Sequence, residues 1–251
     1  MTTLLDVADL TVSYGGLNAV DGVTFAIPEG GIVGLIGPNG AGKTTCIDAL
    51  SGFLPDARGH VSLAGQDLSG RPAHQRARLG LVRTFQSVEL FDDLTIRENL
   101  FVAASPERWW SPLADAVMPR RGLRAAEIGW ALEVVGLDSD GERYPTELSH
   151  GRRRLAGLAR ALASRPRLLL LDEPAAGLDP SESEALAALV RSLPGLGISV
   201  LLVDHDMGLV FGTCEMIHVL DFGILTASGD AASIRSDPAV IEAYLGRGET
   251  P

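Results

Sequence analysis

A strand, a glycine-rich loop and a helix are expected in succession between residues 31 and 50, and this unit constrains the fold more than any other. The loop, Gly37-Pro38-Asn39-Gly40-Ala41-Gly42-Lys43-Thr44, fits the phosphate-loop pattern G-x-x-x-x-G-K-[ST]. Lys43 is the single lysine of the chain, because arginine supplies the other 20 of its 21 basic residues. Lysine offers a compact ammonium where the broad fork of arginine does not fit. The loop therefore predicts a nucleotide triphosphatase.

This predicted phosphate loop would bind anions through its backbone, since glycines let successive N–H groups turn inward at a helix N-terminus. We expect Lys43 to bridge the β- and γ-phosphates, Thr44 to hold Mg²⁺ and Thr45 to reach the α-phosphate. The alternative is a chance glycine turn, which does not explain eight residues with this spacing between an apolar strand and a helix. The expected nucleotide contacts are Gly37, Pro38, Asn39, Gly40, Ala41, Gly42, Lys43, Thr44 and Thr45.

A second chemical element is the apolar run Leu168–Leu171, which ends in Asp172 and Glu173. A strand of this kind places both carboxylates at the carboxyl edge of the sheet, where ligands bind in such folds. Asp172 would orient Mg²⁺ and its waters, and Glu173 would act as the general base on an attacking water. Many strands end in acids, so the run predicts this chemistry only in combination with the phosphate loop.

The order of the expected elements indicates an α/β fold with a parallel sheet covered by helices on both faces. Leu4–Ile27 alternates apolar and polar residues, is cut at Tyr14-Gly15-Gly16, and predicts an N-terminal antiparallel β layer of two or three strands. We expect one domain over residues 1–251, with a core at 1–86 and 158–251 and an inserted helical subdomain at 87–157. Further strands are expected at 31–36, 60–65, 168–171 and 198–203, a hairpin at 216–228, and helices at 44–50, 182–193 and 207–214.

Composition excludes several classes of function. The net charge of −11 argues against nucleic-acid binding, which depends on Lys and Arg. Two clusters of arginine, at 120–124 and 152–154, are locally basic despite the negative net charge. They are interpreted as solvated helix faces, with a docking patch as the alternative. No apolar run approaches the roughly 18 residues of a membrane span, and no secretory signal is seen, so a cytoplasmic chain is expected. Cys46 and Cys214 indicate no disulfide framework or metal site, and Cys46 is expected to be buried.

The segment Leu148-Ser149-His150-Gly151-Arg152 resembles the signature motif of ABC ATPases, usually Leu-Ser-Gly-Gly-Gln. The resemblance covers essentially the whole chain and implies the fold of these ATPases and an ATP-binding subunit of an ABC transporter. The other expected motifs follow in order: Tyr14 before Gly15-Gly16, Gln86 in Arg83-Thr84-Phe85-Gln86, Gly177-Leu178-Asp179 after the acidic pair, and His205 in Asp204-His205-Asp206.

Several segments are also similar to the branched-chain amino acid importers, among them Tyr14–Asp21, Arg83–Gln86, His205–Met207 and Asp237–Gly246. This similarity implies a subunit that hydrolyses ATP to energise the import of branched-chain or other apolar amino acids. Transporters of urea and short amides share much of this sequence, so they remain the alternative.

The resemblance implies roles for individual residues, each with a plain alternative. Gln86 would contact Mg²⁺ and act as a hinge, or else be a solvated loop residue. His205 would contact the γ-phosphate, or else be a histidine at a strand edge. Tyr14 would stack on adenine, or else be a core aromatic. The remaining implied nucleotide contacts are Ser149 and Gly151, which would reach the γ-phosphate across a dimer, and Asp179.

The signature segment departs from the common motif at two positions. His150 replaces a glycine and Arg152 replaces the usual glutamine, whereas Ser149 and Gly151 are retained. Hydrolysis is therefore expected to be intact, although nucleotide affinity at that half-site could differ. His150 could be a pH-sensitive contact, but a neutral exposed side chain is favoured.

The implied partners are membrane permease subunits, a second ATP-binding subunit in a homo- or heterodimer and, indirectly, a periplasmic or extracellular solute-binding protein. The chain would be peripheral, on the cytoplasmic face of the cell membrane. One rival interpretation is a non-transport ABC ATPase, but the chain has neither a long coiled-coil insertion nor a second cassette. A second is a regulatory nucleotide-binding module without turnover, against which Glu173 and His205 argue.

Overall fold

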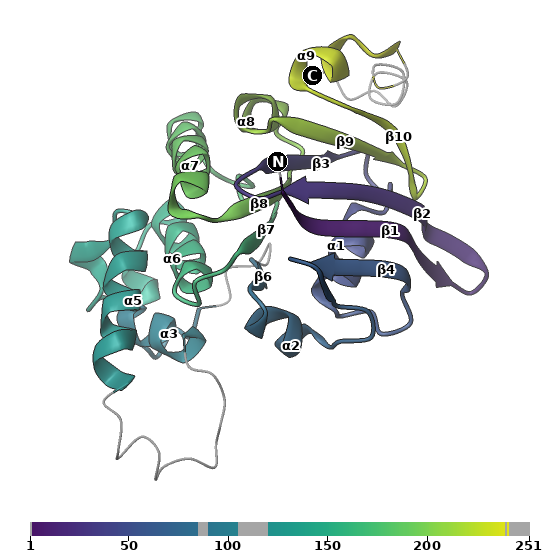
Figure 1. Ribbon diagram of the computed structural model, residues 1–251. Helices are drawn as coiled ribbons and strands as arrows, with labels where there is room; N and C mark the ends of the chain where they lie inside the picture. The colour runs from purple at the N-terminus through teal and green to yellow at the C-terminus, as the bar shows by residue number, and fades with distance from the viewer. Residues whose placement is uncertain (1, 85–89, 105–119, 239, 241–251) are drawn as a thin grey trace. The chain divides into compact units, whose positions relative to one another are not determined.

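The computed structural model describes residues 2–84, 90–104, 120–238 and 240 (Figure 1). The chain divides into two compact units. We call Met1–Arg83 with Arg167–Pro251 the core unit, and Thr84–Pro166 the helical unit. The boundaries of the helical insertion that the sequence suggests, residues 87 and 157, stay a prediction.

The N-terminal part of the core unit is an antiparallel sheet with the strand order β2-β1-β4-β5. The sequence correctly predicted β1 (Thr3–Tyr14) and β2 (Leu17–Pro28), which form a hairpin with Tyr14 opposite Leu17. Strand β4 (Arg58–Leu63) lies on the other side of β1, and β5 (Gln66–Asp67) pairs with β4. The predicted strand 60–65 lies two residues too far along the chain, because β4 begins at Arg58 and the chain turns after Leu63 at Ala64 and Gly65, where φ is 49° and 76°.

The second sheet of the core unit has the order β10-β9-β3-β8-β7-β6. Its parallel strands were predicted except β6, which has only three residues. The hairpin at the far edge was predicted too, and β10 runs antiparallel to β9. The bounds are β3 Ile32–Ile36, β6 Leu81–Arg83, β7 Leu168–Asp172, β8 Ser199–Val203, β9 Met216–Asp221 and β10 Ile224–Gly229.

Both faces of the parallel sheet are covered, as predicted. Alternate residues such as Val33 and Leu35 belong to a core that also contains residues of α1 (Lys43–Ser51), β1, β2 and β4. On the opposite face, a Cβ on Gly34 would lie 3.1 Å from Val210 Cγ1 and from Cys214 Sγ, so α8 (Met207–Thr213) and the residue after it pack there. The first face is thus shared between a helix and the antiparallel sheet, an arrangement that strand order alone did not show.

The remaining helices of the core unit differ from prediction at their ends. Helix α7 (Pro180–Ser192) begins two residues before the predicted start, because Asp179 caps it and Pro180 occupies its first turn. A 3₁₀ turn, Leu193–Leu196, follows α7. Helix α2 (Ala73–Arg78) was not predicted, and α9 is Ala231–Ser236.

The helical unit contains α3 (Ile96–Ala103), α5 (Arg120–Val134) and α6 (His150–Leu162), which contact one another pairwise. Two 3₁₀ turns, Asp138–Asp140 and Pro145–Glu147, join α5 to α6. The predicted helical character of this region is confirmed for the described residues.

His218 is a buried titratable residue of the core unit. It lies on β9, its Nδ1 is 2.7 Å from Ser228 Oγ, and its ring packs at 5.1 Å from the Phe25 ring. Its Nε2 is buried and has no hydrogen-bond partner among the described residues. Burial lowers the pKa of His218 below its ordinary value of 6.5. Below about pH 6.5 the unfolded chain therefore takes up this proton more readily than the folded chain.

We expect the melting temperature to fall as the pH drops from about 7.5 to about 5.5, and His218→Asn to remove part of that fall. His60→Asn is the matched control, since the His60 side chain is 52% exposed. Differential scanning fluorimetry across this pH range measures all three proteins. An unchanged pH dependence in His218→Asn would show that the buried imidazole is not responsible.

Candidate functional site

The phosphate loop is held in place by close backbone contacts. A Cβ on Gly37 would lie 2.1 Å from the carbonyl oxygen of Leu220, and one on Gly42 would lie 2.3 Å from that of Ala19. Gly42 also has φ of 103°, which side chains rarely allow. Both positions therefore require glycine. Lys43 is buried, and its Nζ donates to the carbonyl oxygens of Gly37 (2.6 Å) and Pro38 (3.1 Å), so its ammonium already lies inside the loop.

The turn between β9 and β10 connects the phosphate loop to β2. The N–H of Gly223 donates to the carbonyl oxygen of Ala41 at 2.9 Å, and the carbonyl oxygen of Gly223 accepts from Asp21 at 2.8 Å. Tyr14 lies on the β1–β2 hairpin, whose second strand makes these contacts. It is 54% exposed, so the alternative of a core aromatic is wrong.

Arg83 connects the helix after the phosphate loop to the acidic end of β7. Its Nη2 donates to Asp172 Oδ2 at 2.8 Å, and its Nη1 is paired with Asp48 on α1. The side chains of Arg83 and Asp172 are 7% and 8% exposed. The guanidinium thus joins α1 to the end of β7. Cys46, also on α1, is buried, as predicted, and burial raises the pKa of its thiol to about 12.

Two loops at the carboxyl edge of the parallel sheet are joined through Asp204, which is almost wholly buried. Its Oδ2 accepts from the N–H of Ala175 at 3.0 Å, and its Oδ1 lies 3.5 Å from His205 Nδ1. The N–H of Glu173 donates to the carbonyl oxygen of Val203 at 2.7 Å, and Glu173 has φ of 46°. A left-handed conformation at a residue with a side chain is uncommon and is fixed here by its surroundings.

Asp179 caps α7. Its Oδ1 accepts from the N–H groups of Ser181 (2.8 Å) and Glu182 (2.9 Å), and the Glu182 carboxylate accepts from the Asp179 N–H. The hydrogen bonds from the Glu182 N–H and from the Ser181 hydroxyl lower the pKa of the Asp179 carboxyl. A contact of Asp179 with nucleotide stays a prediction. Gln86 lies outside the described residues.

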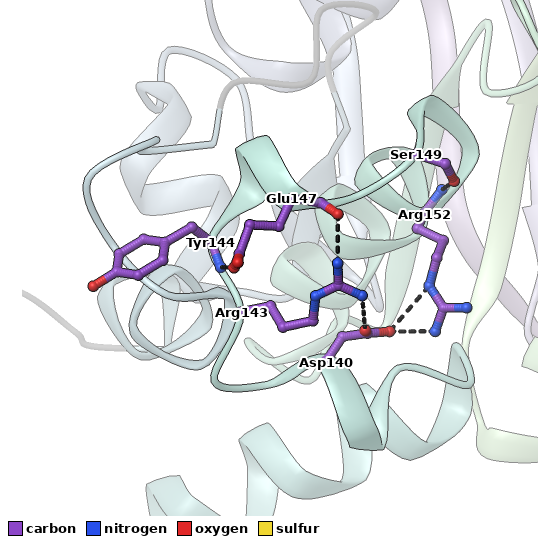
Figure 2. A network of polar contacts seen from close by, with 6 residues as sticks. All are labelled: Asp140, Arg143, Tyr144, Glu147, Ser149 and Arg152. Atoms are coloured by element: carbon purple, nitrogen blue, oxygen red, sulfur yellow. Dashed lines mark hydrogen bonds and ion pairs between the residues drawn. The ribbon is translucent and has the colours of Figure 1, made fainter.

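The signature segment, residues 148–152, opens α6 in the helical unit (Figure 2). Ser149 caps the helix and is exposed, and its Oγ accepts from the N–H of Arg152 at 3.3 Å. His150 is exposed, as predicted, and Gly151 is buried. The Arg152 guanidinium is not simply solvated, because it pairs with the buried carboxylate of Asp140.

The structure brings the phosphate loop, Asp172, Glu173 and His205 to one edge of the sheet. Strands β3, β8 and β7 run parallel side by side, Asp172 is the last residue of β7, and the loop, Glu173 and His205 follow β3, β7 and β8. The residues that sequence reasoning missed are acids. Asp204 and Asp140 are buried and hold motif residues in place, and the half-buried Asp48 pairs with Arg83. The sequence distance between partners, 35 residues for Asp48 and Arg83, leaves no local signal.

The sequence of residues 20–176 matches the profile of the ABC transporter family. The chain belongs to this family. It is 42% identical over 250 residues to the high-affinity branched-chain amino acid transport ATP-binding protein BraF of Pseudomonas aeruginosa, covering 97% of this chain and 98% of BraF. It is 40% identical over 251 residues to LivG of Escherichia coli K12, a protein with the same description, with the same coverage. Residues 227–250 match a second family, described as branched-chain amino acid ATP-binding cassette transporter.

Solved structures of ABC transporter cassettes share this fold. The ADP conformation of the cassette MJ1267 superposes with a TM-score of 0.87 at 29% identity, over 98% of this chain and 100% of that one. A nucleotide-free cassette has a TM-score of 0.86 at 28% identity, over 97% and 99%. The predicted fold class is confirmed, and the chain is an ATP-binding ABC ATPase. Among the described residues, no helix has the length and apolar character to cross a membrane.

The close approach at Gly42 gives a test of the loop geometry. We expect Gly42→Ala to weaken MgATP binding at least about tenfold, or about 1.4 kcal/mol, because the loop or β2 must move to relieve the contact with Ala19. Gly40→Ala is the matched control. Its φ of 82° is also left-handed, but its Cβ would meet nothing within 4 Å. Fluorescence titration with a nucleotide analogue compares the two variants. Equal losses would attribute the effect to backbone strain and contradict the steric explanation.

Proposed function

We propose that this ABC ATPase energises the import of branched-chain or other apolar amino acids. The observation that carries the proposal is identity of 40–42% to branched-chain amino acid transport ATP-binding proteins over 97% of the chain. The match of residues 227–250 to the branched-chain cassette family supports the same solute class from the C-terminal end.

The nucleotide would bind on the phosphate loop. The Lys43 ammonium, now bonded to carbonyl groups of that loop, would exchange these bonds for the β- and γ-phosphates. Loop N–H groups would hold the phosphates and Thr45 the α-phosphate, while the exposed ring of Tyr14 would stack on adenine.

A magnesium ion fits the donor set at this edge. Thr44 offers an exposed hydroxyl and Asp172 a carboxylate, while the described residues contain no group of three or more His, Cys, Asp or Glu side chains suited to a metal. Mg²⁺ usually keeps several waters and binds phosphate oxygens beside one or two protein ligands, so Thr44 and Asp172 match the small number of protein ligands that it takes. Gln86 would complete the set. When bound, the ion neutralises charge on the transferred phosphoryl group.

Hydrolysis would depend on Glu173 and His205. Glu173 would accept the proton of the attacking water, and His205 would donate a hydrogen bond to the γ-phosphate. Asp204 holds the two loops that carry them, through the N–H of Ala175 and its place beside the His205 ring. Glu173 has a left-handed φ of 46°, whereas the neighbouring Asp172 ends β7 and is bonded to Arg83, so the two carboxylates are held differently.

A complete site would need a second ATP-binding subunit. Ser149 and Gly151 stand at the N-terminus of α6, where a helix favours anions, and would contact the γ-phosphate held by the partner's phosphate loop. Asp179 would lie beside the same nucleotide. Permease subunits would hold the pair on the cytoplasmic face of the membrane, and a solute-binding protein would deliver the amino acid.

Glu173→Gln tests the general base. The amide keeps the shape of the side chain but cannot take the proton, so kcat should fall by about 10²–10⁴-fold while ATP binding persists. Phosphate release and nucleotide titration measure the two quantities, and size-exclusion chromatography reports an ATP-trapped dimer. Glu184→Gln is the matched control, because the Glu184 side chain is 74% exposed and pairs with Arg191 on the surface. Near-normal turnover by Glu173→Gln would contradict the assignment.

Uptake measurements test the solute class. In cells that lack this chain, we expect the wild-type protein to restore the uptake of labelled leucine, isoleucine or valine, and Lys43→Ala to fail because the phosphates lose their cation. Labelled urea and acetamide are measured in parallel. Restoration of urea or amide uptake alone would favour the alternative solute, and restoration of neither class would favour a non-transport ABC ATPase.

A further inference from the structure

The first turn of α6 carries an unusual concentration of positive charge. Arg152 and Arg153 follow the cap, at the helix end where the macrodipole already favours anions and disfavours cations. The structure pairs each with a carboxylate of the helical unit. Arg153 Nη2 donates to Asp92 Oδ1 at 3.0 Å, and Arg152 donates to Asp140. The two pairs differ in burial, because the Asp92 side chain is 58% exposed and that of Asp140 is 5% exposed.

Asp140 uses both of its oxygens. Its Oδ2 accepts from Arg152 Nε at 3.0 Å and also from Arg152 Nη2, while its Oδ1 accepts from Arg143 Nη1 at 3.2 Å. Arg143 in turn donates to the carbonyl oxygen of Glu147 at 2.6 Å, two residues before Ser149. The Asp140 carboxylate thus links the first residue of the segment 140–152 to its last residue, Arg152. In Figure 2 the Arg152 side chain extends from the Ser149 end of α6 to Asp140.

We propose that Asp140 is a positioning residue for the signature segment, which restrains Arg152 and keeps its guanidinium away from the Ser149 hydroxyl and the helix N-terminus. This rests on the proposed function, in which that N-terminus meets a γ-phosphate. A free arginine one turn away would compete for the phosphate and repel the dipole. With Asp140 in place, Arg152 occupies the position of the usual glutamine without taking part in anion binding.

Asp140→Asn tests the restraint. We expect kcat for ATP to fall about tenfold while KM changes less than about twofold, because the phosphate loop supplies most of the affinity. Backbone amide exchange at Arg153–Leu155, measured by mass spectrometry without nucleotide, should become faster as the first turn loosens. The rates are normalised to the fraction of protein that binds nucleotide, which corrects for any loss of folded protein.

A rescue experiment distinguishes a restraint on Arg152 from a merely structural role of Asp140. Arg152→Gln alone should keep kcat within about threefold, and Asp140→Asn with Arg152→Gln should regain most of the lost kcat and slow the exchange again, since no free guanidinium remains. Asp92→Asn is the matched control. It makes the same charge change and frees the neighbouring Arg153, yet should leave both measurements near wild type.

The outcomes are distinct. Wild-type kcat or wild-type exchange in Asp140→Asn would overturn the proposal, as would a double variant no better than Asp140→Asn or an equal loss in Asp92→Asn. The proposed function is tested separately by Glu173→Gln. Full hydrolysis in that variant removes the catalytic assignment, whereas the exchange measurement on Asp140 does not depend on hydrolysis.

Discussion

The tight contact between the phosphate loop and the backbone around it is the constraint on which the site depends. Gly37 and Gly42 lie so close to carbonyl oxygens of β9 and β2 that no side chain fits, and Gly223 adds a hydrogen bond to the loop. Two strands, β9 and β2, and the turn after β9 must therefore be correctly placed for the loop to adopt this shape. Formation of the phosphate loop is in this way coupled to formation of both sheets, and the same contact with β2 joins the loop to the β1–β2 hairpin that carries Tyr14.

Buried charge organises the rest of the site. Arg83 joins Asp48 and Asp172, and Asp204 holds the loops of Glu173 and His205. Removing one partner from such a buried pair typically costs about 3–5 kcal/mol, because the other charge is left uncompensated. Each acid therefore holds two elements at a fixed separation. Arg83 is also the last residue of the first segment of the core unit, so the chain enters the helical unit directly after this residue.

The parallel strands could be predicted because each carries its own signal, as in the apolar run Leu168–Leu171. Elements β5, α2 and β6 were missed because they are too short for a periodicity, and β6 exists through its pairing with β7. The phosphate loop was recognised in the sequence because phosphate binding dictates the spacing of its residues, while the roles of the motif residues stay predictions. The contacts of Asp48, Asp140 and Asp204 were not recognised, since a buried acid and a surface acid look alike in a sequence. The left-handed backbone conformation of Glu173 likewise cannot be predicted from the residue type.

The chain's use of arginine connects these observations. In the phosphate loop the ammonium of Lys43 fits between the carbonyl oxygens of Gly37 and Pro38, where a guanidinium is too broad. At position 152 the chain has an arginine where the motif it resembles has glutamine, and the guanidinium N–H groups need oxygen acceptors. At Arg152 a buried carboxylate supplies them. A single substitution in a motif can then leave the exposed surface of that motif intact, because the new charge is directed inward rather than toward the ligand.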